Sequence, residues 1–211
     1  MTKTVMGAAM MLTAMATGDA KTDYVAALDA ESLDGTRIGV ANFAKGSNPD
    51  IHATFDRALS DMEAAGAILV PIDDFSPDTD NFDGKSYDIL KYEFKATLNE
   101  YLASTPDTVK TRTLSEVIAF NKEHADIELA LFGQDILEAS DALGPLTDET
   151  YQTALRDVLR AVREDGLDKL LSESNVDVIV SPSGPVASRI DPVNGDVWPS
   201  WAGAGGLAAR A

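Results

Sequence analysis

Residues 174–185 read SNVDVIVSPSGP, and this stretch indicates the class of fold. A polar turn leads into a short β-branched run, Val176 to Val180, which predicts a strand. The run ends at Ser181-Pro182, and the small or rigid residues 183–185 follow it. Ligands of open α/β sheets bind just beyond the carboxyl ends of the strands. We therefore expect one wall of a ligand pocket directly after this strand.

Residues 37–72 show the order strand, helix, strand. Residues 37–41, RIGVA, and residues 67–72, AILVPI, are predicted strands. Asn48-Pro49-Asp50 begins the helix between them, because proline suits the first helical position and aspartate the positive end of the helix dipole. Gly66 is expected to end that helix. This order predicts a βαβ unit with parallel strands and a right-handed crossover.

The segment 85–172, between the second and third predicted strands, is expected to be a helical insertion. One helix is predicted from about Lys85 to Ala103, and a capping box at Thr113 to Glu116 begins the next. A further helix is expected before Gly144-Pro145, and Thr147 is expected to cap the last one. The apolar positions predicted to face the core are Tyr87, Leu90, Phe94, Leu98 and Leu102; Ile127, Leu131, Phe132, Ile136 and Leu137; and Tyr151, Leu155, Val158 and Val162.

The predicted fold class is therefore α/β, with a mixed, largely parallel sheet core, helices on its faces and a helical insertion. A chain of 211 residues fits one domain with a sizeable core. We assign residues 1–211 to a single domain. Its last residues, GAGGLAARA, look like the opening of a helix.

The composition excludes several function classes. A net charge of -18 repels nucleic acid phosphates and anionic lipids, so we expect neither a nucleic acid partner nor a membrane partner. The chain has no cysteine, which excludes disulfides, thiolate metal sites and a cysteine nucleophile. No apolar run is long enough for a transmembrane helix.

The first twenty residues allow two interpretations. The apolar residues between Val5 and Ala16 recur at helical spacing, which predicts a buried helix that ends at Gly18. A lysine, an apolar stretch and an alanine-rich end also match a secretory leader, which would make the chain a secreted acidic domain. We favour the helix, and we favour a cytoplasmic over a periplasmic or secreted location.

Few residues carry an obvious catalytic signal. Asp73-Asp74 is expected to be a solvated loop, and His52 and His124 are expected to be structural or surface residues. No G-x-S-x-G motif is present. Ser181 and Ser183 flank a proline after a strand, where a serine hydroxyl bonds either a substrate or the local backbone.

The C-terminal part holds further candidates for a ligand site. Trp198 and Trp201 either line an apolar pocket or are ordinary buried side chains. Asp196, next to the turn Asn194-Gly195, either orients a substrate amide or braces the turn. The glycines between Gly203 and Gly206 follow no strand and precede no lysine, so they favour a close helix start over a phosphate loop.

Several of these segments together resemble the amidase signature family, in the branch that includes peptide amidases. The most specific are Ile118-Ala-Phe-Asn121 and Phe132-Gly-Gln-Asp135, within a segment similar to the helical region of bacterial amidases. NVDVIVSPSGP is similar to the strand that leads to the family's substrate cleft, and VNGD at 193–196 to its peptide-amidase branch. MTKTVMGAAMML is similar to the helix after its nucleophile region.

The resemblance implies a mixed sheet covered by helices, of which this chain would be a partial version. It implies hydrolysis of carbon–nitrogen amide bonds by a Ser-cis-Ser-Lys triad, with oxyanion donors in a glycine-rich loop and no metal or organic cofactor. The chain has no GGSS-like or G-S-x-R-x-P-like segment. We therefore expect an amidase fragment that is inactive alone, in which Met1 is an internal methionine of a longer parent.

No catalytic residue is carried over to this chain. Ser183, Gly184, Asn194, Asp196 and Trp201 are expected to bind a small-molecule amide substrate in the complete enzyme. The alternative is a non-catalytic small-molecule-binding or interaction domain derived from an amidase. A fragment of this kind would also expose an apolar sheet face through which it self-associates.

Overall fold

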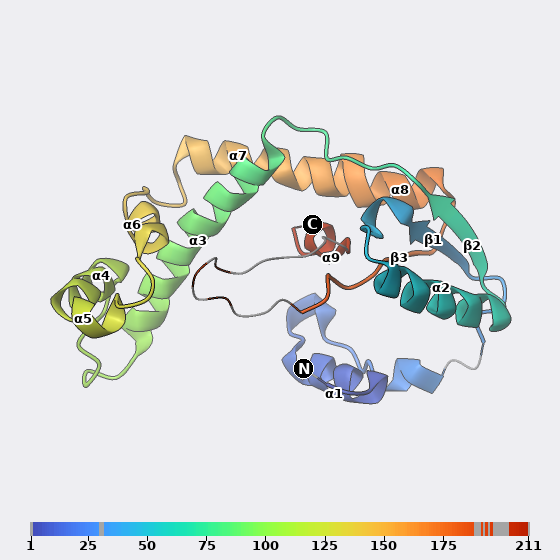
Figure 1. Ribbon diagram of the computed structural model, residues 1–211, viewed down its shortest axis with the longest axis horizontal. Helices are drawn as coiled ribbons and strands as arrows, with labels where there is room; N and C mark the ends of the chain where they lie inside the picture. Colours follow the sequence, from blue (N-terminus) through green and yellow to red (C-terminus); the bar gives the residue numbers. More distant parts are fainter. Residues whose placement is uncertain are drawn as a thin grey trace.

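The structure is a computed structural model that describes residues 2–29, 32–187, 191, 193, 195 and 203–210. The chain forms an arch with a small sheet at one end and short helices at the other (Figure 1). The helices α3 (Phe82–Ser104), α7 (Glu149–Val162) and α8 (Asp168–Glu173) run between the two ends. The fold is α/β, as the sequence predicts.

The sheet has three parallel strands in the order β2-β1-β3. Their bounds are Arg37–Ala41 for β1, Ile68–Ile72 for β2 and Val178–Val180 for β3. Gly39 of the central strand lies opposite Val70 on one side and Ile179 on the other. A Cβ atom at Gly39 would lie 2.8 Å from Cδ1 of Ile72, so a side chain there would force Ile72 to move. The parallel pairing confirms the predicted strand, helix, strand unit.

Helix α2 (Pro49–Ala64) connects β1 to β2 and begins as predicted. The side-chain oxygen of Asn48 accepts hydrogen bonds from the backbone nitrogens of Asp50 and Ile51, at 2.9 and 3.3 Å. Gly66 follows the helix with a φ of +100°, a conformation that strongly favours glycine. Capping and backbone freedom therefore set both ends of α2 locally.

The chain between β2 and β3 is mostly helical. It contains α3, α4 (Leu114–Glu123), α5 (Ala125–Glu128), α6 (Asp135–Asp141), α7, a π-helical turn over Arg163–Leu167, and α8. The capping box at α4 is confirmed, since the Thr113 hydroxyl accepts from the backbone nitrogen of Glu116 at 3.2 Å. The assignment of residues 85–172 as an insertion within one domain stays a prediction.

Two boundary predictions in this region are wrong. The segment expected to form one helix through Ile127 to Leu137 splits into α5 and α6, and Leu131 and Phe132 lie exposed between them. The N-cap of α7 is Asp148 rather than Thr147. Single-sequence periodicity locates helices better than their ends, because the end residues depend on tertiary contacts.

The core of the helical part lies between α3 and α7. It consists of Ile89, Tyr92, Tyr151, Ala154 and Val158. The rings of Tyr92 and Tyr151 lie 5.4 Å apart at 44°, and the Tyr151 hydroxyl donates a 2.9 Å hydrogen bond to Oε1 of Glu93. The prediction for the buried face of α7 is confirmed at Tyr151, Val158 and Val162, whereas Leu155 is only partly buried.

The predicted buried face of α3 is wrong at Tyr87, Leu90 and Phe94, whereas Leu98 and Leu102 are partly buried. The buried positions are Ser86, Ile89 and Tyr92, whereas Tyr87 and Leu90 are 46% and 57% exposed. Helix α7 packs on the first set, and the N-terminal part of the neighbouring apolar stripe, up to Phe94, stays exposed among the described residues. A second partner for that stripe would account for its apolar character.

The N-terminal helix α1 (Val5–Met15) is confirmed as a helix, but its predicted burial is wrong, since Ala9 is its one buried residue. It ends at the C-cap Ala16. Gly18, the predicted stop, instead begins the short 3-10 helix Gly18–Ala20 with a φ of +59°. Two further 3-10 turns follow at Ala26–Asp29 and Asn42–Ala44, and the short helix α9 spans Gly205–Ala208. Across the described ranges, no helix combines the length and apolar character needed to cross a membrane.

Candidate functional site

The carboxyl ends of the three strands meet at one edge of the sheet, because the strands are parallel. The turn Asn42–Ala44 follows β1, Asp73 and Asp74 follow β2, and Ser181 follows β3. This is the edge at which open α/β sheets bind ligands. The segments that follow β1 and β2 therefore lie at the same edge as the pocket wall predicted after residue 180.

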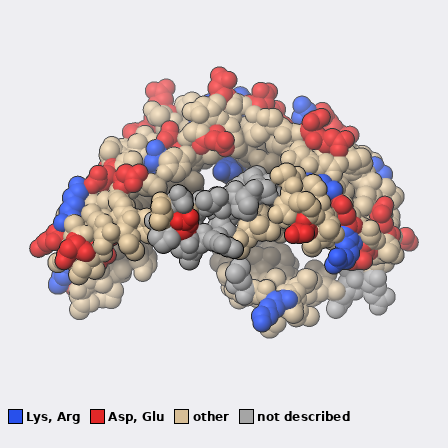
Figure 2. All heavy atoms as spheres, viewed as in Figure 1, with Lys and Arg blue, Asp and Glu red and all other residues tan. Residues whose placement is uncertain are grey.

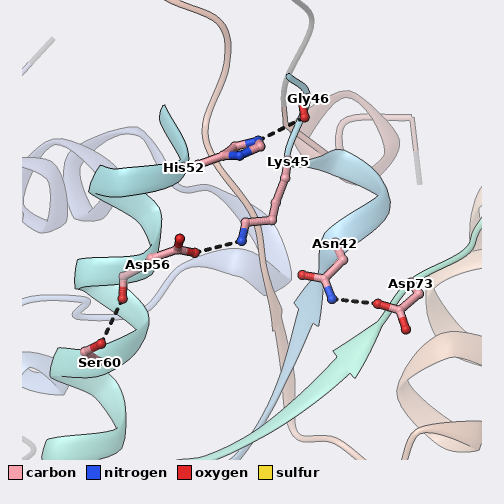
Figure 3. A network of polar contacts seen from close by, with 7 residues as sticks. All are labelled: Asn42, Lys45, Gly46, His52, Asp56, Ser60 and Asp73. Atoms are coloured by element: carbon pink, nitrogen blue, oxygen red, sulfur yellow. Dashed lines mark hydrogen bonds and ion pairs between the residues drawn. The ribbon is translucent and has the colours of Figure 1, made fainter. Parts of the chain in front are cut away.

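A group of polar contacts holds the segments after β1 and β2 in place (Figure 3). The side-chain amide of Asn42 donates to Oδ1 of Asp73 at 2.7 Å. Lys45, on the same turn, pairs with Asp56 of α2 at 2.7 Å. A ring nitrogen of His52 lies 3.0 Å from the carbonyl oxygen of Gly46. These side chains therefore have structural partners, as expected for His52.

A groove of about 650 Å³ opens beside these strand ends. Its walls include three aromatic residues, Phe43, Phe75 and Phe82, and two charged residues, Asp83 and Arg210. The rings of Phe43 and Phe75 lie 5.5 Å apart at 54°. The lining therefore mixes apolar and polar groups, and small-molecule sites use both kinds, apolar walls to bury a ligand and polar groups to orient it.

The segment after β3 is held by the start of the C-terminal segment. The Ser181 hydroxyl donates to the carbonyl oxygen of Pro182 and accepts from the backbone nitrogen of Ala204, both at 3.0 Å. The Gly203 nitrogen donates to the Ala44 carbonyl oxygen at 2.7 Å. A Cβ atom at Gly203, where φ is +105°, would lie 2.7 Å from the oxygen of Pro182. The Ser181 hydroxyl therefore bonds the local backbone, which is one of the two roles expected for this serine.

Ser183 and Gly184 lie on the open side of this segment. Ser183 is exposed, and within ranges 2–29, 32–187 and 203–210 its hydroxyl has no hydrogen-bond partner. Apart from its two chain neighbours, no atom of the described residues lies within 4 Å of the Cβ position at Gly184. Neither residue lines the 650 Å³ groove. Asn194, Asp196 and Trp201, and also Trp198, lie outside the described residues.

Sequence reasoning missed the aromatic walls of the groove. Phe43 and Phe75 each follow the carboxyl end of a predicted strand by two or three positions, at residues 41 and 72. That spacing is a signal that could have placed them at the ligand edge. Phe82 gave no such signal, because only the start of α3 brings it to the groove.

The described part of the site has no serine hydroxyl paired with a lysine amine. Lys45 pairs with Asp56 and Lys85 with Asp157, each at 2.7 Å, and Lys85 also donates to the hydroxyl of Thr79, a groove residue, at 3.1 Å. Between described residues, no serine hydroxyl bonds the side-chain nitrogen of a lysine; the Ser172 hydroxyl donates only to the backbone carbonyl oxygen of Lys169. Nor do the described residues bring together three or more histidine or carboxylate groups in a metal-binding cluster. The geometry suits binding and orientation of a ligand.

The fold combines a parallel sheet, a helical segment between β2 and β3, and a ligand edge. Comparison with known proteins assigns this α/β arrangement to a family. The chain belongs to the amidase family, whose model matches residues 1–192. It is 28% identical over 170 residues to a glutamyl-tRNA(Gln) amidotransferase subunit of Acinetobacter baylyi, and the match covers 79% of this chain and 33% of that protein.

Solved peptide amidases share the fold. The native peptide amidase of Stenotrophomonas maltophilia is 32% identical with a TM-score of 0.73, and the match covers 94% of this chain and 39% of that one. A peptide amidase in complex with the competitive inhibitor chymostatin is 30% identical with a TM-score of 0.71, covering 94% of this chain and 40% of that one. The resemblance to the peptide-amidase branch is thus confirmed. The chain spans about a third of the length of the amidotransferase protein and about two-fifths of the peptide amidases.

Proposed function

We propose that this chain forms part of an amidase that hydrolyses carbon–nitrogen amide bonds, with the Ser-Ser-Lys triad supplied by residues outside the chain. The family match over residues 1–192 is the observation that carries the proposal. Among the described residues no serine hydroxyl bonds a lysine side chain, which agrees with a triad located elsewhere.

The role of this chain is to position the substrate. The aromatic groove holds an apolar group of the amide, and the Ser183 hydroxyl, as a donor and an acceptor, hydrogen-bonds the amide itself. Gly184 lets the substrate approach the backbone closely, because no side chain stands in the way. Asn194, Asp196 and Trp201 complete the substrate-binding set.

The reaction consumes one water molecule. An activated serine hydroxyl attacks the amide carbon, the amine leaves with a proton, and water then releases the acid and frees the serine. Holding the carbonyl near the nucleophile lowers the entropic part of the barrier, and this is the contribution of the residues after β3. The peptide amidases that resemble this chain suggest an amide of a peptide as the substrate.

A second function is favoured by the groove itself. A groove of about 650 Å³ is formed by this chain alone, so the chain binds a small amide without cleaving it if no triad is ever supplied. This alternative describes a non-catalytic binding domain derived from an amidase. Hydrolysis by a completed enzyme separates the two functions.

The test compares the 211-residue chain alone with a chimera. In the chimera, this chain replaces the aligned part of the S. maltophilia peptide amidase. A peptide amide serves as substrate, ammonia release reports hydrolysis, and calorimetry reports binding. We expect hydrolysis by the chimera and not by the chain alone, and a loss of activity in Ser183→Ala but not in the distant control Ser172→Ala. Hydrolysis by the chain alone would refute the external triad, and a folded but inactive chimera would refute the amidase function.

A further inference from the structure

Helix α1 is apolar around its whole circumference and yet exposed. Residues 4–18 contain no charged side chain. Val5 is 72% exposed, Met10 59% and Met15 63%, and Met6, Met11 and Leu12 are also exposed. A helix that is apolar on every side is normally buried. Large exposed apolar patches of this kind mark interaction surfaces.

The described chain does little to hold α1. The hydrogen bonds of residues 2–29 to other described residues all stay within that segment. The longest of them in sequence joins the Tyr24 nitrogen to the Thr13 hydroxyl at 3.1 Å. These hydrogen bonds therefore do not attach α1 to the rest of the described chain, and its apolar side chains stay exposed to solvent.

A second uncovered apolar region lies on α3. Tyr87, Leu90, Phe94 and Tyr101 are exposed on the side that α7 leaves free. Leu90 borders a cavity of about 170 Å³ together with Ser86 and Arg210. The Ser86 side chain is buried, and its hydroxyl has no partner among the described residues. An unpaired buried hydroxyl is costly, and an incoming polar group would satisfy it.

Charge separates these apolar regions from the rest of the surface. Asp and Glu side chains gather along the outer, convex side of the arch, whereas the region of α1 below it is largely uncharged (Figure 2). The net charge of -18 opposes both association with a second copy and binding to an anionic lipid surface. The surface therefore suits a polypeptide with an apolar face.

We propose that two unpartnered apolar regions, the exposed side chains of α1 and the exposed stripe Tyr87, Leu90, Phe94 and Tyr101 of α3, dock one polypeptide, which carries the part of the amidase fold that this chain does not match. The match covers only 39% of the S. maltophilia peptide amidase, so most of that fold has no counterpart here. A polar group of the docked polypeptide bonds Ser86. This inference rests on the proposed function and names the partner that brings the triad.

The test co-expresses the full 211-residue chain with the portion of the S. maltophilia peptide amidase outside the aligned region. Light scattering gives the mass of the complex, and hydrogen exchange reports the protection of α1. We expect a one-to-one complex in which α1 exchanges at least tenfold more slowly than in the free chain of 22.4 kDa. Met10→Lys should weaken the complex at least tenfold. Ile127→Lys, a control that is 73% exposed at the other end of the arch, should not.

Three results would overturn the proposal. They are no complex, a dimer of this chain that Met10→Lys dissociates, and binding of α1 to neutral phosphatidylcholine vesicles. If the complex forms but does not hydrolyse the amide, the docking surface stands and the amidase function is refuted. If the Met10→Lys variant forms an equally tight complex that still hydrolyses the amide, the amidase function stands and the proposed docking surface is refuted.

Discussion

The side-chain amide of Asn42 donates a 2.7 Å hydrogen bond to the carboxylate of Asp73. This contact joins the segments that follow β1 and β2, the two strands paired in parallel over their whole length. It fixes the spacing of the loops that carry Phe43 and Phe75 into the groove. The shape of the ligand edge therefore depends on a pair of residues that contact no ligand in our proposal.

Removing the Asp73 carboxylate should loosen this edge. We expect Asp73→Ala to lower the free energy of unfolding by about 1 kcal/mol, the usual net value of one hydrogen bond. Asp74→Ala is the matched control, because Asp74 is exposed and makes no such contact with the described residues. Urea denaturation measures both, and equal stabilities of the two variants would contradict the structural role of Asp73.

Substitution of Ser181 should affect mainly the stability of the fold, whereas substitution of Ser183 should affect mainly amide binding. Ser181→Ala removes the acceptor of the Ala204 nitrogen and should cost about 1 kcal/mol of stability. Ser183→Ala should leave the unfolding free energy unchanged and weaken binding of an amide. Thermal unfolding and calorimetry on both variants check this split. A stability loss in Ser183→Ala would mean that its hydroxyl has a structural partner.

Tyr151 should make the chain sensitive to high pH. Burial, followed by its hydrogen bond to Glu93, raises the pKa of Tyr151 from 10.0 to about 12. Between these values the unfolded state loses the phenolic proton while the folded state keeps it, so stability falls as the pH rises. Tyr151 alone should contribute a slope of about 1.4 kcal/mol per pH unit.

Tyr151→Phe removes this titration and should flatten the slope between pH 10.0 and about 12. A smaller slope should remain, because burial and the nearby Asp148 also raise the pKa of Tyr92. Urea denaturation at several pH values provides the measurement. An unchanged slope in Tyr151→Phe would place the pH dependence elsewhere.

The ion pair of Lys85 with Asp157 should be visible in a carboxyl titration. The hydrogen bond from Lys85 lowers the pKa of Asp157 below 3.8. A lowered carboxyl pKa stabilises the fold above pH 3.8, and this contribution disappears as the pH falls through the folded-state pKa. Lys85→Met should move the pKa of Asp157 back up in an NMR titration, and Lys169→Met should not.

The capping box at α4 provides a local test. Thr113→Ala removes the hydroxyl that accepts from the Glu116 nitrogen, and it should cost about 1 kcal/mol of stability. Thr113→Ser keeps the hydroxyl and should recover most of the loss. If both variants lose the same stability, packing of the threonine methyl group is the cause instead.

Sequence patterns predicted the elements whose signals are local. Strand β1 has the predicted bounds Arg37–Ala41, and α2 begins at the predicted Asn48-Pro49-Asp50 signal. Caps, prolines and glycines act within a few residues, so a single sequence contains the whole signal. The substrate set had no such signal. Ser183 and Gly184 were placed only by their position after β3, and their role stays a prediction.

The sequence by itself determined which segments become helix or strand, the parallel βαβ order and the membership of the amidase family. Tertiary structure alone decided which of two adjacent stripes of α3 is buried, that α1 stays exposed, and that Phe43, Phe75 and Phe82 form one groove. The physical reason is that local hydrogen bonding and periodicity are encoded within a helical turn or two. Burial depends on which distant surface is present to cover a face, and the sequence of that face does not specify its partner.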